Sequence, residues 1–251
     1  MRRIGAEPAA DETLDTFYHG RIFVLQKKRG YRFSLDAPLL ADFIHTRPTD
    51  RLLELGAGNG IISLLLSRKP FRKIVCLEIQ SGLADLARRN VALNHLENKI
   101  TVLEQDLRTY HTGEKYDVVF SNPPYLRKKG GPLSPSGEKS IAKHEIKGDV
   151  FDIMQAAGKV LERDGRVYVI YPAKRKKDFD RALEESGLKL NTLRYVQTRS
   201  GTAAHWFLAE CRFEVSSPDI RPPLHVYGER GEYMPEMKAI FAGEDRGPLV
   251  E

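Results

Sequence analysis

Strand-like and helix-like segments alternate along the chain from about residue 50 onward. Short apolar runs that predict buried strands lie at 51–55, 73–79, 99–106, 116–122 and 165–171. Segments with the apolar spacing of helices lie at 60–69, 81–96, 144–162 and 177–186. Strands and helices in this order form a doubly wound, largely parallel sheet with helices on both faces. Right-handed crossovers then bring the carboxyl ends of the strands to one edge, where ligands bind.

Two further strand-like runs, 188–197 and 204–213, follow one another without a helix between them and predict an antiparallel pair. They bring the expected α/β sheet to seven strands, most of them parallel. On this basis the chain divides into an N-terminal extension (1–49), a central domain (50–215) and a C-terminal tail (216–251).

The N-terminal extension has less regular structure in its pattern. Residues 1–16 are polar and are expected to be mobile. A short apolar run at 22–26 predicts a strand. Residues 34–45 have the spacing of a helix, with Ser34 or Asp36 as its cap.

The composition adds a weak constraint on partners and compartment. The chain of 251 residues carries 40 lysines and arginines against 34 acidic residues, and its pI is about 9.2. This excess is compatible with a polyanionic partner without demonstrating one. No apolar run approaches the roughly 20 residues needed to span a bilayer, and the N-terminus lacks the apolar core of a secretory signal. Cys76 and Cys211 lie in apolar strand contexts, which indicates reduced, buried thiols and a cytoplasmic protein.

A glycine-rich turn follows the first strand of the central domain. In LLELGAGNG, Gly56, Gly58 and Gly60 stand between a strand and the next helix. Glycine permits a sharp backbone turn and a close approach to a ligand, because no Cβ stands in the way. A dinucleotide fingerprint would place its third glycine at position 61, which is Ile61 here. The spacing, preceded by Glu54, instead resembles the cofactor motif E-x-G-x-G-x-G of S-adenosylmethionine (SAM)-dependent methyltransferases.

Acidic residues at the ends of the neighbouring strands extend this cofactor site. Glu78 ends the second strand, where its carboxylate could accept both ribose hydroxyls of SAM. Asp106 ends the third strand, where it could accept from the adenine amino group of SAM. Ile79 and Leu107, which follow them, are included in the predicted site. Glu54 either holds the loop or binds the methionine amine. Each of these acids could instead be a solvated strand end.

The fourth strand ends in Ser121-Asn122-Pro123-Pro124-Tyr125, on the same expected edge as the glycine turn. The last four residues match the N-P-P-Y motif of methyltransferases that act on amino groups. Such a nitrogen is a poor nucleophile, because its lone pair is delocalised. The side-chain oxygen of Asn122 and the carbonyl of Pro123 can accept its two hydrogens and aim the lone pair, while Tyr125 stacks on the flat target. Asn122 therefore belongs to both the catalytic and the cofactor side of the predicted site. The alternative is a simple turn after a strand.

The motif alone leaves the amino group open. Adenine N6 in DNA or RNA, guanine N2 in RNA and glutamine N5 in proteins are methylated by enzymes with similar tetrapeptides. The glutamine enzymes normally carry a helical N-terminal domain, and DNA adenine enzymes usually add a target-recognition domain. Neither has an evident counterpart in this sequence. A catalytically idle SAM-binding module also remains open.

Over nearly its whole length the chain resembles the tRNA1(Val) (adenine(37)-N6)-methyltransferase family. The resemblance rests on YRFSLDAPLLADF at 31–43, LLELGAGNG, SNPPYL and IAKHEI at 141–146. It implies a Rossmann-like class I methyltransferase that uses SAM to methylate adenine N6 in RNA, with adenine 37 in a tRNA anticodon loop as the expected target. By the same resemblance, Phe33, Ser34 and Asp36 lie near the cofactor. Methylation of a protein glutamine at N5 or of rRNA guanine at N2 stays open as an alternative.

Basic residues flank the predicted active site. Arg127, Lys128 and Lys129 follow Tyr125 in a loop rich in glycine, proline and lysine, and Lys174, Arg175 and Lys176 follow the fifth strand. Together they are expected to contact tRNA phosphates, and a solvated surface cluster is the alternative. The expected chemistry requires no metal ion.

Overall fold

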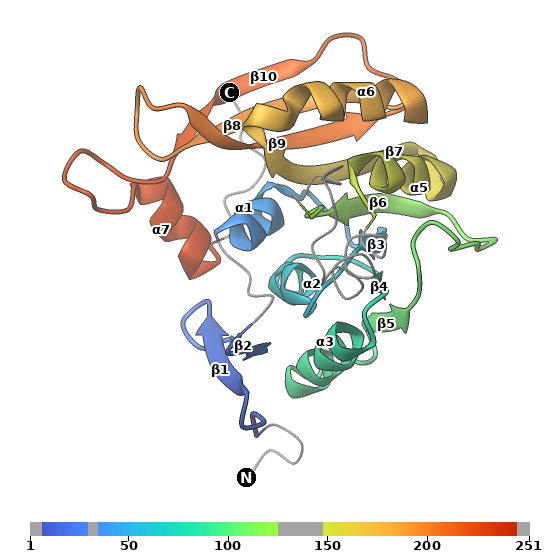
Figure 1. Ribbon diagram of the computed structural model, residues 1–251, viewed down its shortest axis with the longest axis vertical. Coiled ribbons are helices and arrows are strands. Elements are labelled where there is room, and N and C mark those ends of the chain that lie inside the picture. Colours follow the sequence, from blue (N-terminus) through green and yellow to red (C-terminus); the bar gives the residue numbers. More distant parts are fainter. Residues whose placement is uncertain (1–6, 30–34, 125–147, 245–251) are drawn as a thin grey trace, which may run out of the picture.

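One mixed sheet forms the centre of the molecule in the computed structural model, which describes residues 7–29, 35–124 and 148–244 (Figure 1). Its strands are β3 (Arg51–Leu55), β4 (Lys73–Glu78), β5 (Ile100–Glu104), β6 (Tyr116–Ser121), β7 (Leu161–Pro172), β8 (Lys189–Gln197), β9 (Ala204–Arg212) and β10 (Asp219–His225). Across the sheet they run in the order β10-β8-β9-β7-β6-β3-β4-β5. β9 is antiparallel to β7 and β8, and all other neighbours are parallel. This confirms the predicted mostly parallel α/β sheet with an antiparallel pair near its end.

The sheet has one strand more than the seven expected, because the C-terminal tail adds β10 beside β8 at the edge. Pro222 and Pro223 lie where the register of this pairing shifts, between Arg221 and Leu224. Proline cannot donate to a strand ladder and is tolerated only at an edge or a bulge. Because of these two prolines, the sequence pattern did not predict a strand here.

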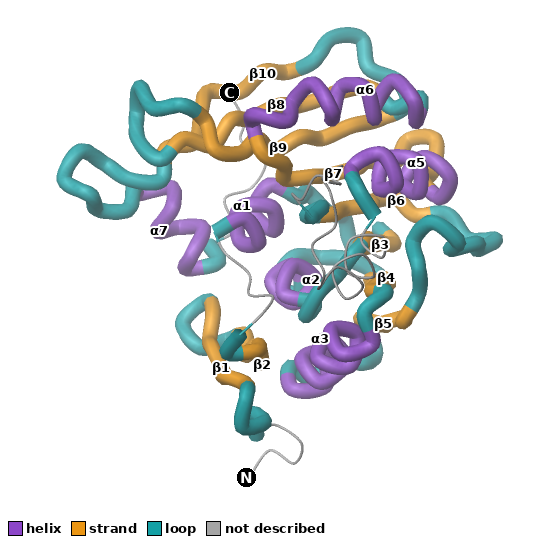
Figure 2. The backbone as a smooth tube through the Cα atoms, viewed as in Figure 1, coloured by secondary structure: helices purple, strands orange, loops and turns teal. Residues whose placement is uncertain are grey.

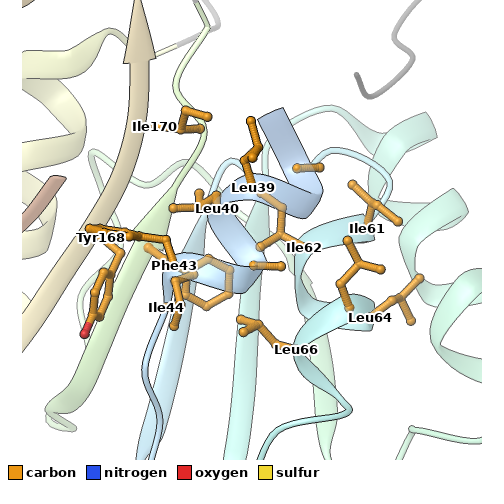
Figure 3. Close-up of a cluster of buried hydrophobic side chains, with 14 of the residues drawn as sticks. Leu39, Leu40, Phe43, Ile44, Ile61, Ile62, Leu64, Leu66, Tyr168 and Ile170 are labelled. Atoms are coloured by element: carbon orange, nitrogen blue, oxygen red, sulfur yellow. The ribbon is translucent and has the colours of Figure 1, made fainter. Parts of the chain in front are cut away.

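Helices cover both faces of the sheet (Figure 2). On one face lie α1 (Asp36–Phe43), α2 (Ile61–Leu66), α3 (Ser81–Leu93) and α7 (Pro235–Ala242), and on the other lie α5 (Val150–Val160) and α6 (Lys176–Ser186). Successive residues of a strand point to opposite faces, so Leu52 packs in the core cluster of α1 and α2, whereas Leu53 packs in that of α5 and α6. Figure 3 shows the first cluster, where α1 and α2 meet Tyr168 and Ile170 of β7. Burial on both faces explains why these strands are continuous apolar runs.

The N-terminal extension contains a separate two-stranded ribbon, β1 (Glu12–Phe17) and β2 (Ile22–Lys27). β2 confirms the strand predicted at 22–26. The expectation of mobility up to residue 16 is wrong for residues 12–16, which belong to β1. Glu12 is buried there, and its two carboxylate oxygens accept from the two terminal nitrogens of Arg89 on α3, each at 2.8 Å. This partner lies far along the sequence, so a local pattern could not reveal it.

Asn90 of α3 and Asn94, which caps the C-terminus of this helix, hold β2 by its backbone. Asn90 accepts from the Leu25 N–H at 2.6 Å and donates to the Leu25 carbonyl at 2.9 Å. Asn94 does the same for Phe23, at 2.9 and 2.7 Å. Residues i and i+4 of a helix share a face, so the two amides serve as a substitute for a neighbouring strand. Asn90 Nδ2 also donates to the Asn59 carbonyl at 2.9 Å, which ties the ribbon to the glycine turn.

The boundaries of α5 differ from the predicted helix at 144–162. Asp149 caps α5, because its side chain accepts from the backbone N–H groups of Phe151 and Asp152 in a capping box, and the helix begins at Val150. The predicted residues 144–147 lie outside the described part of the chain. The helix ends at Val160, where β7 already starts. Within the described residues, no helix has the length and apolar character needed to cross a membrane.

Candidate active site

The glycine turn lies at the carboxyl edge of the sheet and is anchored to both neighbours of β3. The backbone N–H groups of Gly56 and Ala57 both donate to the Leu77 carbonyl of β4, each at 2.9 Å. On the other side, the Ser121 hydroxyl at the end of β6 donates to the Leu55 carbonyl at 2.7 Å. The segment that follows β6 is therefore held beside the glycine turn, as the sequence predicts.

All three glycines of the turn adopt left-handed backbone conformations. Their φ angles are 73° at Gly56, 59° at Gly58 and 81° at Gly60. Residues with a Cβ rarely adopt this region, so the conformation itself requires glycine. A Cβ on Gly56 would meet no atom of the described residues within 4 Å, so among these residues the turn faces open space there. At Gly60 a Cβ would lie 3.4 Å from the Ala87 Cβ of α3.

Glu78 faces the glycine turn from the end of β4. One of its carboxylate oxygens accepts from the Gly58 N–H at 2.8 Å, and the other accepts from the Gln80 N–H at 2.9 Å. The oxygen that accepts from the Gln80 N–H also accepts from the Gln80 Nε2 at 3.3 Å, so acceptor capacity for hydroxyl donors remains mainly on the oxygen that faces Gly58. Ile79, between these residues, is half-buried. This arrangement is compatible with the predicted contact to the ribose of SAM.

Glu54 lies inside the protein, with only 1% of its surface exposed. Its carboxylate accepts hydrogen bonds from the Ser63 hydroxyl of α2 and, at 3.6 Å, from the Cys76 thiol of β4. Burial raises the pKa of Glu54 to about 8, against the opposing effect of the Ser63 hydrogen bond. Burial also raises the pKa of the Cys76 thiol. Of the two predicted roles, these contacts favour holding the turn over binding the methionine amine.

Asp106 follows β5, and Arg108 already engages its carboxylate. The Arg108 Nε lies 3.0 Å from each carboxylate oxygen, and the Arg108 backbone N–H donates to Oδ1 at 2.9 Å. These hydrogen bonds lower the pKa of Asp106. Leu107 is half-buried against the core cluster of α5 and α6. A cofactor amino group would have to share the Asp106 carboxylate with Arg108, so this contact stays a prediction.

Asn59, inside the glycine turn, was missed as a site residue. It is 0% exposed, and neither its side-chain oxygen nor its side-chain nitrogen has a hydrogen-bond partner within the described part of the chain. Buried polar groups almost always have a partner, so the Asn59 amide calls for a ligand or a water molecule. Together with the open face at Gly56 and the Glu78 carboxylate, it fits the expected SAM. Its position within the glycine motif was the available signal.

Asn122, Pro123 and Pro124 follow β6 directly, as the sequence predicts. Asn122 is half-buried, and its Nδ2 donates to the Asp36 Oδ2 at 2.8 Å, although the two residues are 86 positions apart. Asp36 is the first residue of α1 and is 6% exposed. Its other oxygen accepts from the Ala37 N–H at 3.0 Å. The structure thus brings together two predicted site residues from distant segments.

The structure describes only some of the other residues that the sequence predicts for the active site and for RNA contact. Phe33, Ser34, Tyr125, Arg127, Lys128 and Lys129 lie outside the described residues. Lys174 is exposed on the short 3-10 turn after β7. No group of three or more histidine, cysteine, aspartate or glutamate side chains that could hold a metal ion occurs among the residues that the structure describes.

Arg175 and Lys176 are engaged within the protein. The Arg175 Nε lies 3.0 Å from the Asp178 Oδ2, and its side chain is 11% exposed. Lys176 pairs with Asp180, and its ammonium lies 5.9 Å from the centroid of the Phe207 ring. These partners neutralise both cations at the start of α6. The structure therefore does not support Arg175 and Lys176 as RNA contacts.

Comparison with known proteins relates the chain to methyltransferases. The model of the Methyltransferase small domain family matches residues 32–199. A tRNA1(Val) (adenine(37)-N6)-methyltransferase of Phocaeicola vulgatus is 28% identical over 231 residues, which are 90% of this chain and 94% of the relative. A protein of the same name from Dyadobacter fermentans is 26% identical over 211 residues, 83% of this chain and 87% of the relative.

The fold has solved counterparts. The crystal structure of a predicted O-methyltransferase from Agrobacterium tumefaciens has a TM-score of 0.65 to this chain at 19% identity, and covers 83% of this chain and 96% of that chain. At this identity the likeness concerns the fold alone.

Proposed function

The chain belongs to the methyltransferase small domain family and uses SAM as its methyl donor. On this premise, we propose that it methylates the N6 amino group of an adenine in RNA. The proposed target is adenine 37 in the anticodon loop of a tRNA. The observation that carries the proposal is the Asn122-Pro123-Pro124 segment, which follows β6 at the edge that holds the glycine turn. The names of the relatives from Phocaeicola vulgatus and Dyadobacter fermentans support the same target.

When bound, SAM supplies an electrophilic methyl group. Glu78 and the backbone of the glycine turn are the residues proposed to hold it, with the Asn59 amide as a further partner. Asp106 would add a contact that it shares with Arg108.

The residues after β6 act on the target base. The side-chain oxygen of Asn122 and the carbonyl of Pro123 accept the two amino hydrogens, so the nitrogen lone pair leaves its conjugation with the ring. That lone pair would form the new bond to the methyl carbon while the bond between this carbon and the SAM sulfur breaks, and S-adenosylhomocysteine would leave as a neutral thioether. The nitrogen would then be positive until one of its hydrogens leaves as a proton to water. Acceptor oxygens stabilise this positive charge. Because proline restricts φ, Pro123 and Pro124 keep the acceptors aimed.

An unpaired loop base suits such a site, since its amino edge can enter a pocket without breaking a duplex. Stacking by Tyr125 is part of the proposal, and so are phosphate contacts by Lys174 and by Arg127, Lys128 and Lys129. A tRNA substrate also fits the cytoplasmic location that the sequence predicts.

The test of the substrate is incubation with methyl-labelled SAM and separate pools of unmodified tRNA, rRNA, duplex DNA and protein extract. We expect label in tRNA that digests to N6-methyladenosine and maps to position 37. N2-methylguanosine in rRNA, or label in protein glutamine, would show that the proposed substrate is wrong. Neither result would contradict the fold or the amino-group site.

The test of the site is Asn122→Ala. Removing one of two acceptors is expected to lower kcat about 100-fold or more, because acceptors aimed at developing charge act mainly in the transition state. SAM affinity, measured by calorimetry, should fall by a much smaller factor than kcat, although Asn122 also lies on the cofactor side of the predicted site. Asn98→Ala is the matched control, since Asn98 is exposed in the loop before β5, at the opposite edge of the sheet. Methylation by Asn122→Ala at the wild-type rate would refute the site.

A further inference from the structure

The Asp36 carboxylate lies directly behind the Asn122 amide. The Nδ2–Oδ2 distance is 2.8 Å, and Asp36 is 6% exposed, so water has little access to this contact. The position of Asp36 at the start of α1 is fixed, because Leu40 and Phe43 of this helix pack in the core cluster (Figure 3). The second Asp36 oxygen accepts from the Ala37 N–H at 3.0 Å, which restricts the carboxylate further.

This contact decides which end of the Asn122 amide faces the substrate. A carboxylate only accepts hydrogen bonds, so it must be met by the amide nitrogen, and the amide oxygen then points away from Asp36. An unconstrained asparagine amide can turn over about its last side-chain bond at low cost. A reversed amide would present N–H donors to an amino group that itself brings two donors, and no hydrogen bond could form.

We infer that Asp36 is a positioning residue that orients Asn122 for the amino group, an inference that rests on the proposed function. Its charge has a second effect. A hydrogen bond to a carboxylate polarises the amide and makes its oxygen a stronger acceptor. The target nitrogen gains positive charge as its new bond forms, and a negative charge one hydrogen bond behind the acceptor favours that change.

Two other roles for Asp36 make different predictions. A residue that binds SAM itself would change SAM affinity when replaced. A residue that only supports the start of α1 would change stability without a selective effect on kcat. In the structure Leu35 precedes the helix and makes no side-chain capping hydrogen bond, and the Asp36 carboxylate accepts from the Ala37 N–H and also from the Asn122 amide.

The first test is a double-mutant cycle on methylation of the RNA substrate. Asp36→Ala is expected to lower kcat about 10- to 100-fold, with the KM for RNA and the Kd for SAM within about threefold of wild type. In the Asn122→Ala background the same change should have no further effect, because Asp36 acts through Asn122. Asp36→Asn offers an uncharged acceptor of the same shape and should recover about half or more of the lost activity on a logarithmic scale.

Asp42→Ala on the same helix is the matched control and should retain the wild-type kcat. Equal losses from Asp36→Ala in the wild-type and Asn122→Ala backgrounds would overturn the inference, and so would an effect confined to SAM affinity. An Asp36→Asn variant that folds and is no better than Asp36→Ala would overturn the acceptor role.

The second test needs no substrate. In ¹⁵N-labelled protein, the side-chain NH₂ signals of Asn122 can be assigned by their loss in Asn122→Ala. We expect them to move upfield and to exchange faster with water in Asp36→Ala, and unchanged signals would overturn the pairing. If the wild type labels no amino group in any pool, the proposed function fails, whereas these signals still report whether Asp36 orients Asn122.

Discussion

Replacement of Glu54 by glutamine is expected to stabilise the protein at alkaline pH and to leave its stability nearly unchanged in acid. Glu54 is 1% exposed, and burial raises its pKa from the ordinary 4.5 to about 8. Below pH 4.5 both the folded and the unfolded chain carry the proton. As the pH rises from 4.5 to about 8, the unfolded chain releases it and the folded chain retains it, so the free energy of unfolding falls across this window.

The size of the effect follows from the shift. Each pKa unit corresponds to about 1.4 kcal/mol, so a change from 4.5 to about 8 lowers the wild-type stability by about 5 kcal/mol between the two limits. Glutamine has nearly the same shape and does not titrate in this range. Its amide can keep a hydrogen bond with Ser63, whose hydroxyl can accept as well as donate. The variant should therefore lose this pH dependence and keep the contact between β3 and α2.

The assay is urea unfolding at pH 5, 6.5 and 8.5, followed by the fluorescence of Trp206, which is the one tryptophan in the sequence. Glu184→Gln is the control, because Glu184 is exposed on α6. Calorimetry on the same variants should show SAM affinity within about threefold of wild type, since a contact that only holds the turn acts indirectly. Parallel stability curves for the wild type and Glu54→Gln would refute the buried, protonated state, and a loss of SAM binding of tenfold or more would refute the loop-holding role.

Two further predictions concern other carboxylates. Glu78→Ala is expected to weaken SAM binding about 10- to 100-fold in calorimetry, because it removes a charged acceptor and leaves the Gly58 N–H without this acceptor. Glu104→Ala is the control and should bind SAM like the wild type, since Glu104 is exposed and lies opposite Glu78 in the sheet register. Hydrogen bonds from Arg89 lower the pKa of Glu12 to about 2, so Glu12 stabilises the fold above pH 4.5 and loses this effect as the pH falls toward 2. Glu12→Gln should lower the free energy of unfolding at pH 7 by about 1 to 3 kcal/mol, and a deficit that persists unchanged at pH 2 would contradict this account.

The predictable part of this fold depends on short-range patterns. β3, β4 and β6 were evident as apolar runs because both of their faces are buried. The glycine turn was evident because three left-handed backbone positions leave a fixed spacing in the sequence. Alternation of strands and helices then determined the parallel arrangement, and with it the common edge at which the cofactor turn and the N-P-P segment meet.

The elements that the sequence concealed depend on partners far along the chain. β1 is held at Glu12 by Arg89, which is 77 residues away. β10 contains two prolines, which disfavour a strand in the sequence pattern, and it forms a strand by pairing with β8. The basic run after β7 is a different case, because its signal was present. Arg175 and Asp178 are three residues apart and Lys176 and Asp180 four apart, a spacing that predicts ion pairs on a helix. Only Lys174 of the three predicted cations there remains exposed.

The same distinction applies within the candidate site. The motif around Asn122 specifies an amide next to a carbonyl, but an amide has a donor end and an acceptor end, and no local pattern states which end meets the substrate. That choice depends on Asp36, which is 86 positions earlier and on another element. The sequence marks both residues, one through the N-P-P-Y motif and the other through its place in the helix before β3. The hydrogen bond between Asp36 and Asn122 joins the two predicted residues in one site. This is why we expect an acidic residue at the start of α1 to affect the reaction at the end of β6.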